Sequence, residues 1–274
     1  NPNGIGGTHS YSVRLTDEKL EWLRKDLATV DKQTPVFVGM HVPLHKTPTL
    51  DDTGRTTTSY NMEDAERFVE CLEGYDVNIL TGHTHYNFNI TKSERLREHN
   101  IAVCATWWWT GHTDYAGNHI CRDGSPGGYK IFEATGSDVR WYYKSIGKDA
   151  GYQFRTYDLN ECLLEKSDFC PSASDSDFAK YAFGYDRAND NNEVLINVFD
   201  WADDWKIEVT DLSDDSSLAV QRVRTHDPLH VISYNMRKLD KKSAMTFPTS
   251  YSAHMFKVKA RTASSSLRIV VTDG

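Results

Sequence analysis

VFVGMHVPL, residues 36–44, is a short apolar run that leads directly into His41 and Pro43. A second run of the same kind, VNILTGHTH at residues 77–85, leads into His83 and His85. Short apolar runs bounded by such residues are typical of buried strands. Both stretches therefore predict a strand whose carboxyl end carries imidazole side chains.

The segments before these two strands have helical patterns. Residues 15–27 place leucines on one face, with Thr16 as the expected cap, and residues 61–72 form a second apolar face that Gly74 ends. The order helix–strand–helix–strand predicts an α/β layout. In such layouts functional groups gather at the carboxyl ends of the strands.

After residue 100 the pattern changes to short strands. Segments 101–105, 128–133 and 139–143 are strand-like, and residues 146–178 resemble a linker. Regularly spaced strands predict a β-sandwich. The expected fold class is α/β, part of an αββα sandwich in residues 1–175, followed by an all-β sandwich-like domain in residues 176–274. The expected C-terminal strands are 194–199, 205–209, 218–222, 255–260 and 267–271.

Composition excludes several classes of protein. The formal net charge is −8, so we expect no nucleic-acid polymer as partner, and no apolar stretch is long enough to span a membrane. The many Trp, Tyr, Asn and Asp residues favour a periplasmic or secreted protein, and Asn89 heads a glycosylation sequon. None of the five cysteines forms a CxxC pair. Cys162 and Cys170 are either bridged to each other or free thiols.

The histidines at the strand ends favour a metal site. In an extended His-x-His segment both rings lie on one side of the chain, where they could bind one ion or two neighbouring ions. Imidazole suits Zn, Fe, Mn or Ni. The remaining isolated histidines lack metal-ligand spacing, and we expect them to be polar surface groups. They are His9, His99, His119, His226, His230 and His254.

At these residues the chain resembles the calcineurin-like metallophosphoesterases, which carry a strand ending in His-x-Pro and then a strand ending in Gly-His-x-His. The two signatures occur here in that order, with a helix between them. The LEWL helix at residues 20–23, the WWWTG segment at 107–111 and the DGSPGGY segment at 123–129 are also similar to a bacterial exported branch of this family. That branch has an added C-terminal domain, which residues 197–201, 205–207, 227–228 and 270–274 resemble.

The resemblance implies a metal-dependent phosphoester hydrolase. His41 and His83 would bind one divalent ion and His85 a second, with Mn, Fe, Zn or Ni as the candidate metals. A hydroxide shared by the ions would attack phosphorus. The implied partner is a phosphoester small molecule or a phosphorylated glycan. Trp109 and His112 are candidate substrate-binding residues.

The chain departs from the family where the first signatures should stand. Asp-x-His, Gly-Asp and Gly-Asn-His-Asp/Glu are absent from residues 1–35. Without their carboxylates, three neutral imidazoles hold two dications poorly. We therefore expect the C-terminal portion of a phosphoesterase, inactive alone. The N-terminal half would be removed or never made, supplied by another polypeptide, or missing from the chain as given.

Two other functions compete with this interpretation. A mononuclear zinc hydrolase could use His41, His83 and His85 as its three ligands. Alternatively, the C-terminal strands could form a module that binds a carbohydrate or a protein partner. The number of metal ions bound distinguishes the mononuclear zinc hydrolase from the dinuclear phosphoesterase. Glycan binding by the C-terminal strands would identify the binding module.

Overall fold

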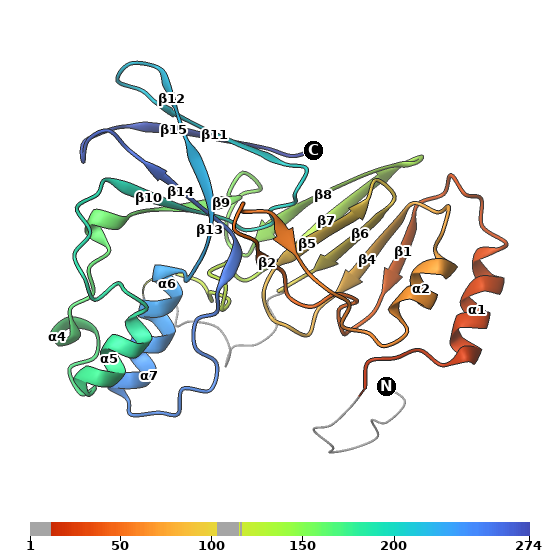
Figure 1. Cartoon of the computed structure of the whole chain (residues 1–274), viewed down its shortest axis with the longest axis horizontal. Helices are drawn as coiled ribbons and strands as arrows, with labels where there is room; N and C mark the ends of the chain where they lie inside the picture. Colours follow the sequence, from red (N-terminus) through yellow and green to blue (C-terminus); the bar gives the residue numbers. More distant parts are fainter. Residues whose placement is uncertain (1–11, 103–114, 116) are drawn as a thin grey trace.

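The computed structural model describes residues 12–102, 115 and 117–274. It has mixed α/β content, with most residues of regular structure in strands that form several small sheets (Figure 1). The expectation of an α/β part followed by a β-rich part is confirmed at this level. The αββα sandwich, the β-sandwich and the boundary at residue 175 remain predictions.

A four-stranded sheet, in the order β1-β4-β6-β5, organises the first part. β1 and β6 run parallel to β4, and β5 runs antiparallel to β6. Parallel neighbours place the carboxyl ends of β1 and β4 at the same edge. The elements of this part are α1 (Asp17–Leu27), β1 (Val36–Gly39), β2 (Thr49–Leu50), β3 (Thr56–Thr57), α2 (Ala65–Cys71), β4 (Val77–Thr81), β5 (Phe88–Ser93) and β6 (Leu96–Asn100).

The two predicted helices and strands are confirmed, with small shifts at their ends. The Thr16 side chain caps α1 by accepting from the Lys19 amide. α2 begins later than expected, after Asp64, and the Asn61 side chain donates to the carbonyl of Pro43.

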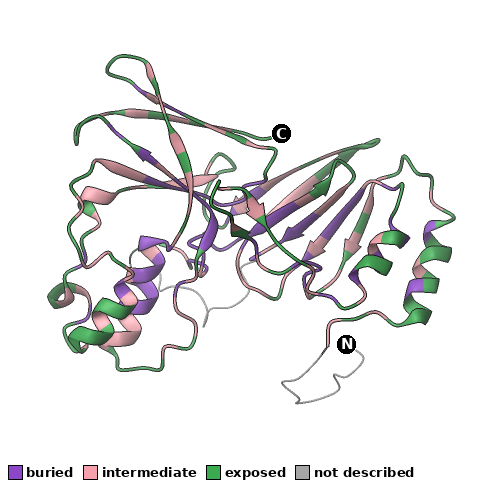
Figure 2. Cartoon of the chain, viewed as in Figure 1, coloured by how far each residue is buried: buried purple, intermediate pink, exposed green. Residues whose placement is uncertain are grey.

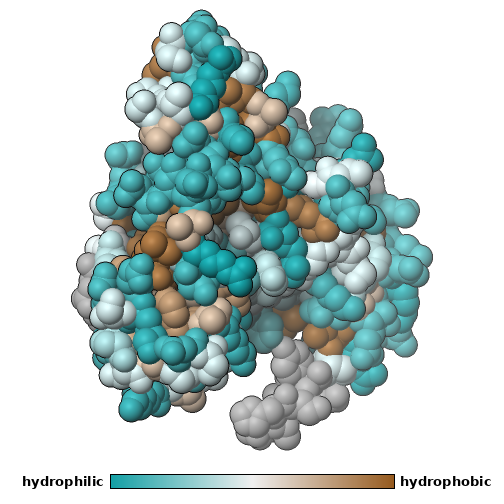
Figure 3. Space-filling model, turned by 60° about the vertical axis from the view of Figure 1, so that its left-hand side comes forward, coloured by the Kyte–Doolittle hydropathy of each residue, from teal (hydrophilic) through white to brown (hydrophobic). Residues whose placement is uncertain are grey.

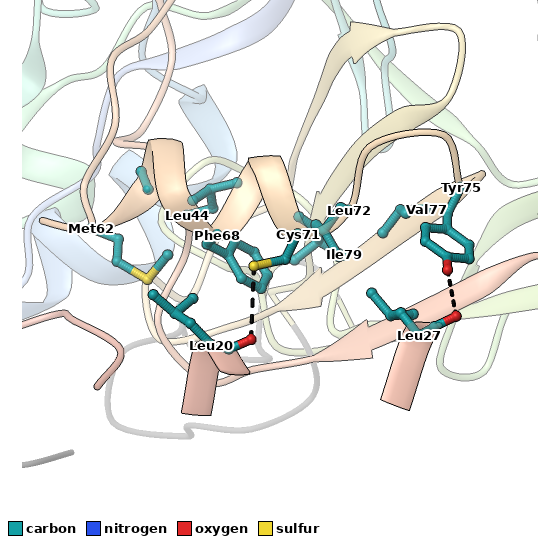
Figure 4. Close-up of a cluster of buried hydrophobic side chains, with 11 residues drawn as sticks. Leu20, Leu27, Leu44, Met62, Phe68, Cys71, Leu72, Tyr75, Val77 and Ile79 are labelled. Carbon is teal, nitrogen blue, oxygen red and sulfur yellow. Dashed lines mark hydrogen bonds between the residues drawn. The ribbon is translucent and has the colours of Figure 1, made fainter. Parts of the chain in front are cut away.

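A cluster of buried side chains joins both helices to the sheet (Figure 4). Leu20 and Leu27 lie on one face of α1 and pack toward α2 and β4. The Tyr75 hydroxyl donates to the Leu27 carbonyl, and the Cys71 thiol lies 3.9 Å from the Leu20 carbonyl. This packing fixes β4, and with it the residues that follow β4.

The β5–β6 hairpin was not predicted from the sequence, and most of the strand predicted at 101–105 lies outside the described residues. β6 ends at Asn100, and Ile101 and Ala102 are outside any strand; residues 103–105 lie outside the described part. β7 and β8 form a hairpin where strands were predicted. Their bounds are β7 (Gly128–Thr135) and β8 (Asp138–Ser145).

Two sheets make up most of the C-terminal part, in the orders β13-β14-β10-β9 and β12-β11-β15. Both contribute to one buried cluster, in which Ile196, Val209 and Phe256 are each almost inaccessible to solvent (Figure 2). The strands are β9 (Phe154–Asp158), β10 (Glu193–Val198), β11 (Lys206–Asp211), β12 (Ser216–Leu218), β13 (Val220–Thr225), β14 (Ser252–Lys259) and β15 (Leu267–Thr272).

The expected linker at residues 146–178 contains regular structure. β9 pairs with β10, so it belongs to the C-terminal sheet although it precedes residue 175. Short helices that were not predicted also occur in the C-terminal part, and several of them, near the lower left of Figure 1, share a third buried cluster. These elements are η1 (Leu159–Glu161), α4 (Lys166–Phe169), α5 (Asp175–Ala182), α6 (Pro228–His230), η2 (Val231–Met236) and α7 (Arg237–Asp240). Cys162 and Cys170 are free thiols.

A fully buried ion pair links the two parts. Lys130 Nζ on β7 lies 2.7 Å from Asp200 Oδ1, and both side chains are inaccessible to solvent. The Asn89 amide donates to the Asp200 side chain and to the carbonyls of Asp200 and Trp201. Asn89 is therefore a buried structural residue, and its amide is not available for glycosylation in the folded chain.

Four histidines that we expected at the surface are buried instead: His99, His226, His230 and His254. Three of them have ring nitrogens within hydrogen-bond distance of buried polar side chains, which offsets the cost of removing them from water. His226 is different because it lies between aromatic rings. Its ring stacks on Phe183, with centroids 3.6 Å apart, and contacts Tyr251 at 4.0 Å.

Stability is expected to fall in acid partly through His226. Burial, with Arg224 as a second cause, lowers its pKa from the usual 6.5 to about 4. Between these two pKa values the imidazole is protonated in the unfolded chain and neutral in the folded chain. The contribution of neutral His226 to the free energy of unfolding is therefore fully present above pH 6.5 and is lost as the pH falls toward 4. The variant His226→Phe should show a weaker loss of urea stability between these pH values than the unmodified chain. Equal losses in both proteins would refute this role.

Candidate functional site

The backbone brings the two predicted histidine segments together at one edge of the sheet. β1 pairs with β4 from Val36 opposite Val77 to Gly39 opposite Leu80. Two further hydrogen bonds continue beyond the strands, from the Met40 amide to the Leu80 carbonyl and from the Gly82 amide to the His41 carbonyl. His41 and Gly82 are therefore neighbours, at the carboxyl ends of the two strands, where the sequence predicted that functional groups gather.

The chain after β4 is bent, and this corrects the expectation of an extended His-x-His segment. His83 and His85 have φ values of 69° and 63°, in the left-handed region. Residues other than glycine seldom adopt this conformation, and such strain is often found at functional sites. Gly82, directly before this bend, is not one of the described glycines with positive φ.

The rings of His41 and His83 meet. His41 Nε2 and His83 Nδ1 are 3.2 Å apart, and the ring planes are at 80°. His41 and His83 are exposed, and His85 is partly buried. The structure therefore brings together two of the three predicted ligands by a direct contact.

The charges of His41 and His83 affect the pKa of the third histidine, His85. Desolvation and then His41 lower the pKa of His83. Desolvation, His83, His41 and Arg122 lower the pKa of His85, in that order. Lowered pKa values favour neutral imidazole, which is the form that binds metals.

The geometry of the pair fits two positions on a single ion. Two nitrogens bound to one tetrahedral Zn²⁺ at about 2.0–2.1 Å lie about 3.3 Å apart, close to the 3.2 Å between His41 Nε2 and His83 Nδ1. Within the described ranges, no group of three or more His, Cys, Asp or Glu residues is arranged to hold a metal. The pair thus fits part of one coordination shell, and no carboxylate joins it there.

Tyr86, the residue after His85 in the sequence, lines a small pocket. One wall contains the buried pair Asp123 and His254, whose Oδ2 and Nε2 atoms are 3.0 Å apart. Asp123 also accepts hydrogen bonds from the amides of Asn87 and Ser125. Sequence reasoning missed this pair because its members are 131 positions apart and only the folded chain brings them together.

The predicted substrate-binding residues Trp109 and His112 lie outside the described residues. On the face shown in Figure 3, hydrophilic residues cover most of the surface and hydrophobic residues appear in small patches. No helix in the described part of the chain combines the length and apolar character needed to cross a membrane.

Comparison with protein families gives a match that covers much of the chain. Residues 98–274 match the family described as the C terminal of calcineurin-like phosphoesterase, which is more than half of the chain. The chain belongs to the calcineurin-like phosphoesterases, as a C-terminal portion. This confirms the family that the sequence resembled. Searches of curated proteins and of solved structures found no match.

The match begins at Glu98, so His41, His83 and His85 all precede the matched residues of this calcineurin-like phosphoesterase. The family assignment and the histidine geometry are therefore independent observations. Phosphoesterases of this family are hydrolases that generally use divalent metals. The assignment of individual metal ligands in this chain is a proposal, which we argue next.

Proposed function

We propose that the chain forms part of the metal centre of a phosphoester hydrolase. The observation that supports it best is the 3.2 Å approach of His41 Nε2 to His83 Nδ1 at the ends of two parallel strands. In this proposal His41 and His83 bind one divalent ion, Mn, Fe, Zn or Ni, and His85 serves a second ion in the complete centre.

Bound divalent ions supply activated water and neutralise charge on the phosphoryl group. The chain's own contribution is to hold neutral imidazoles at a fixed separation. The proposed substrate is a phosphoester small molecule or a phosphorylated glycan. Because the described residues place no carboxylate beside the histidine pair, we propose that the chain alone lacks phosphoesterase activity.

Metal binding tests this proposal. Equilibrium dialysis of the full chain against Zn²⁺ should show one bound ion. Substitution His83→Ala should weaken binding on the order of 100-fold or more, since it removes one of the two paired ligands. The matched control is His119→Ala, which changes an exposed histidine outside the pair.

Three outcomes decide between the interpretations. Binding that survives His83→Ala, or no binding at all, contradicts the proposed centre. One Zn²⁺ that also requires His85, together with hydrolysis by the chain alone, supports the mononuclear zinc hydrolase. One Zn²⁺ without hydrolysis supports the incomplete dinuclear centre.

A second candidate function is carbohydrate binding, favoured by one specific groove. This groove lies between the β2–β3 segment and the C-terminal sheets. Trp201, Trp205 and Arg222 contribute to its lining. Aromatic faces beside polar groups suit sugars. A glycan array probed with the full chain would reveal such binding, and the variant Lys206→Ala should then weaken it.

A further inference from the structure

Glu98 is a buried carboxylate for which the described residues provide no lysine or arginine partner, only an imidazole. It lies on β6, opposite Ile79 of β4, and is 2% exposed. Burying a carboxylate is costly unless hydrogen bonds replace its water. Glu98 obtains these bonds from backbone amides, one hydroxyl and one imidazole.

Four groups contact this carboxylate, and each lies near a histidine of the candidate site. Oε1 accepts from the Leu44 amide at 2.8 Å and from the Thr81 hydroxyl at 3.2 Å. Oε2 accepts from the His45 amide at 3.1 Å and lies 2.7 Å from His45 Nδ1. Leu44 and His45 follow His41 in the same loop, and Thr81 precedes His83 by two residues.

One side chain therefore ties together the two segments whose histidines meet. The backbone bonds near residues 40 and 82 align the segments, but His41 itself is exposed and begins a loop. The contacts to Leu44 and His45 anchor the far side of that loop.

We propose that Glu98 is a positioning residue that holds the loop after β1 against the end of β4 and so sets His41 against His83. The metal-binding consequence rests on the proposed function, whereas the effect on the two rings does not. Residues that orient metal ligands typically change metal affinity by about 10–100-fold when they are substituted.

The test uses Glu98→Gln in the full chain. A glutamine keeps the size of the side chain but replaces one acceptor oxygen with an NH₂ group that faces N–H donors. Without metal, we expect faster hydrogen exchange at the Leu44 and His45 amides. We also expect altered imidazole ¹⁵N signals of His41 and His83. With Zn²⁺ added, we expect binding weaker by about 10–100-fold.

Two control variants separate positioning from general damage. Glu94→Gln changes an exposed carboxylate at the neighbouring β5–β6 turn and should leave all three readouts unchanged. Val77→Ala removes buried methyl groups at the opposite end of β4 and should lower stability while the two rings stay in place.

The outcomes distinguish failure of this inference from failure of the proposed function. Unchanged amide protection and unchanged imidazole signals in Glu98→Gln overturn the positioning role. The positioning role is also overturned if Val77→Ala alters the imidazole signals and amide protection as much as Glu98→Gln does. If the unmodified chain binds no Zn²⁺, the proposed metal centre fails, and the metal-free readouts still decide the role of Glu98.

Discussion

Supplied with Mn²⁺ or Zn²⁺, the chain alone is expected to hydrolyse bis(p-nitrophenyl) phosphate no faster than a variant that lacks both His41 and His83. Two-metal hydrolysis needs ions held close together, and their mutual repulsion is normally reduced by carboxylate ligands. The described residues offer an imidazole pair at 3.2 Å and no acidic ligand beside it. The expected difference in rate from a complete two-metal enzyme is large, because enzymes accelerate reactions by about 10⁶-fold or more.

The measurement is the initial rate of p-nitrophenolate release at saturating metal. The control is the double variant His41→Ala/His83→Ala, which corrects for free metal ions. Turnover of about 1 s⁻¹ or faster that disappears in the double variant would show that the chain is a complete enzyme. The proposed incomplete centre would then be wrong.

The largest effect on stability is expected from Lys130→Met. This change leaves the Asp200 carboxylate buried without its cation, and breaking a buried pair in this way costs about 3–5 kcal/mol. Lys130 Nζ also lies 2.5 Å from Asn89 Oδ1, so the substitution leaves a second buried acceptor without this donor. Because the pair joins β7 to the segment after β10, both parts of the chain should be destabilised.

A surface ion pair provides a matched control. Lys166 Nζ lies 2.6 Å from Asp175 Oδ1, almost the same separation as in the buried pair, but the Asp175 side chain is 93% exposed. Exposed pairs contribute about 0–1 kcal/mol. Urea unfolding followed by tryptophan fluorescence should therefore show a far smaller loss for Lys166→Met. Equal losses for the two variants would contradict the structural role of the buried pair.

Local patterns were sufficient to predict the elements that carry the candidate site. β1 and β4 are short apolar runs with histidines directly after them, and their parallel pairing follows from the helix between them. The N-cap at Thr16 was also readable, because capping depends on residues within one turn. Such features need no knowledge of distant contacts.

Long-range polar pairing explains the main failures. The β6 sequence Leu96-Arg97-Glu98-His99-Asn100 reads as a polar surface segment, yet its last three residues are buried. Their partners lie elsewhere in the chain, as in the 3.1 Å contact of His99 with Asn78 and the contacts of Glu98 with the loop after β1. Hydrophobic periodicity cannot reveal burial that depends on such partners.

The sequence does contain a start signal for one of the helices that were not predicted, α6. Asp227 caps α6 and Pro228 occupies its first turn, which is a favourable start for a helix. The regular spacing of the strands on either side is a stronger signal, and it favours an all-β segment. The bends at His83 and His85 had no such signal, since a left-handed conformation at histidine is set by its surroundings.

Crystals grown with Zn²⁺ test the central claim most directly, through the anomalous difference map at the zinc edge. The proposed centre predicts a peak about 2.0–2.1 Å from both His41 Nε2 and His83 Nδ1. A map with no peak between these nitrogens, while the two rings keep their direct contact, would contradict it.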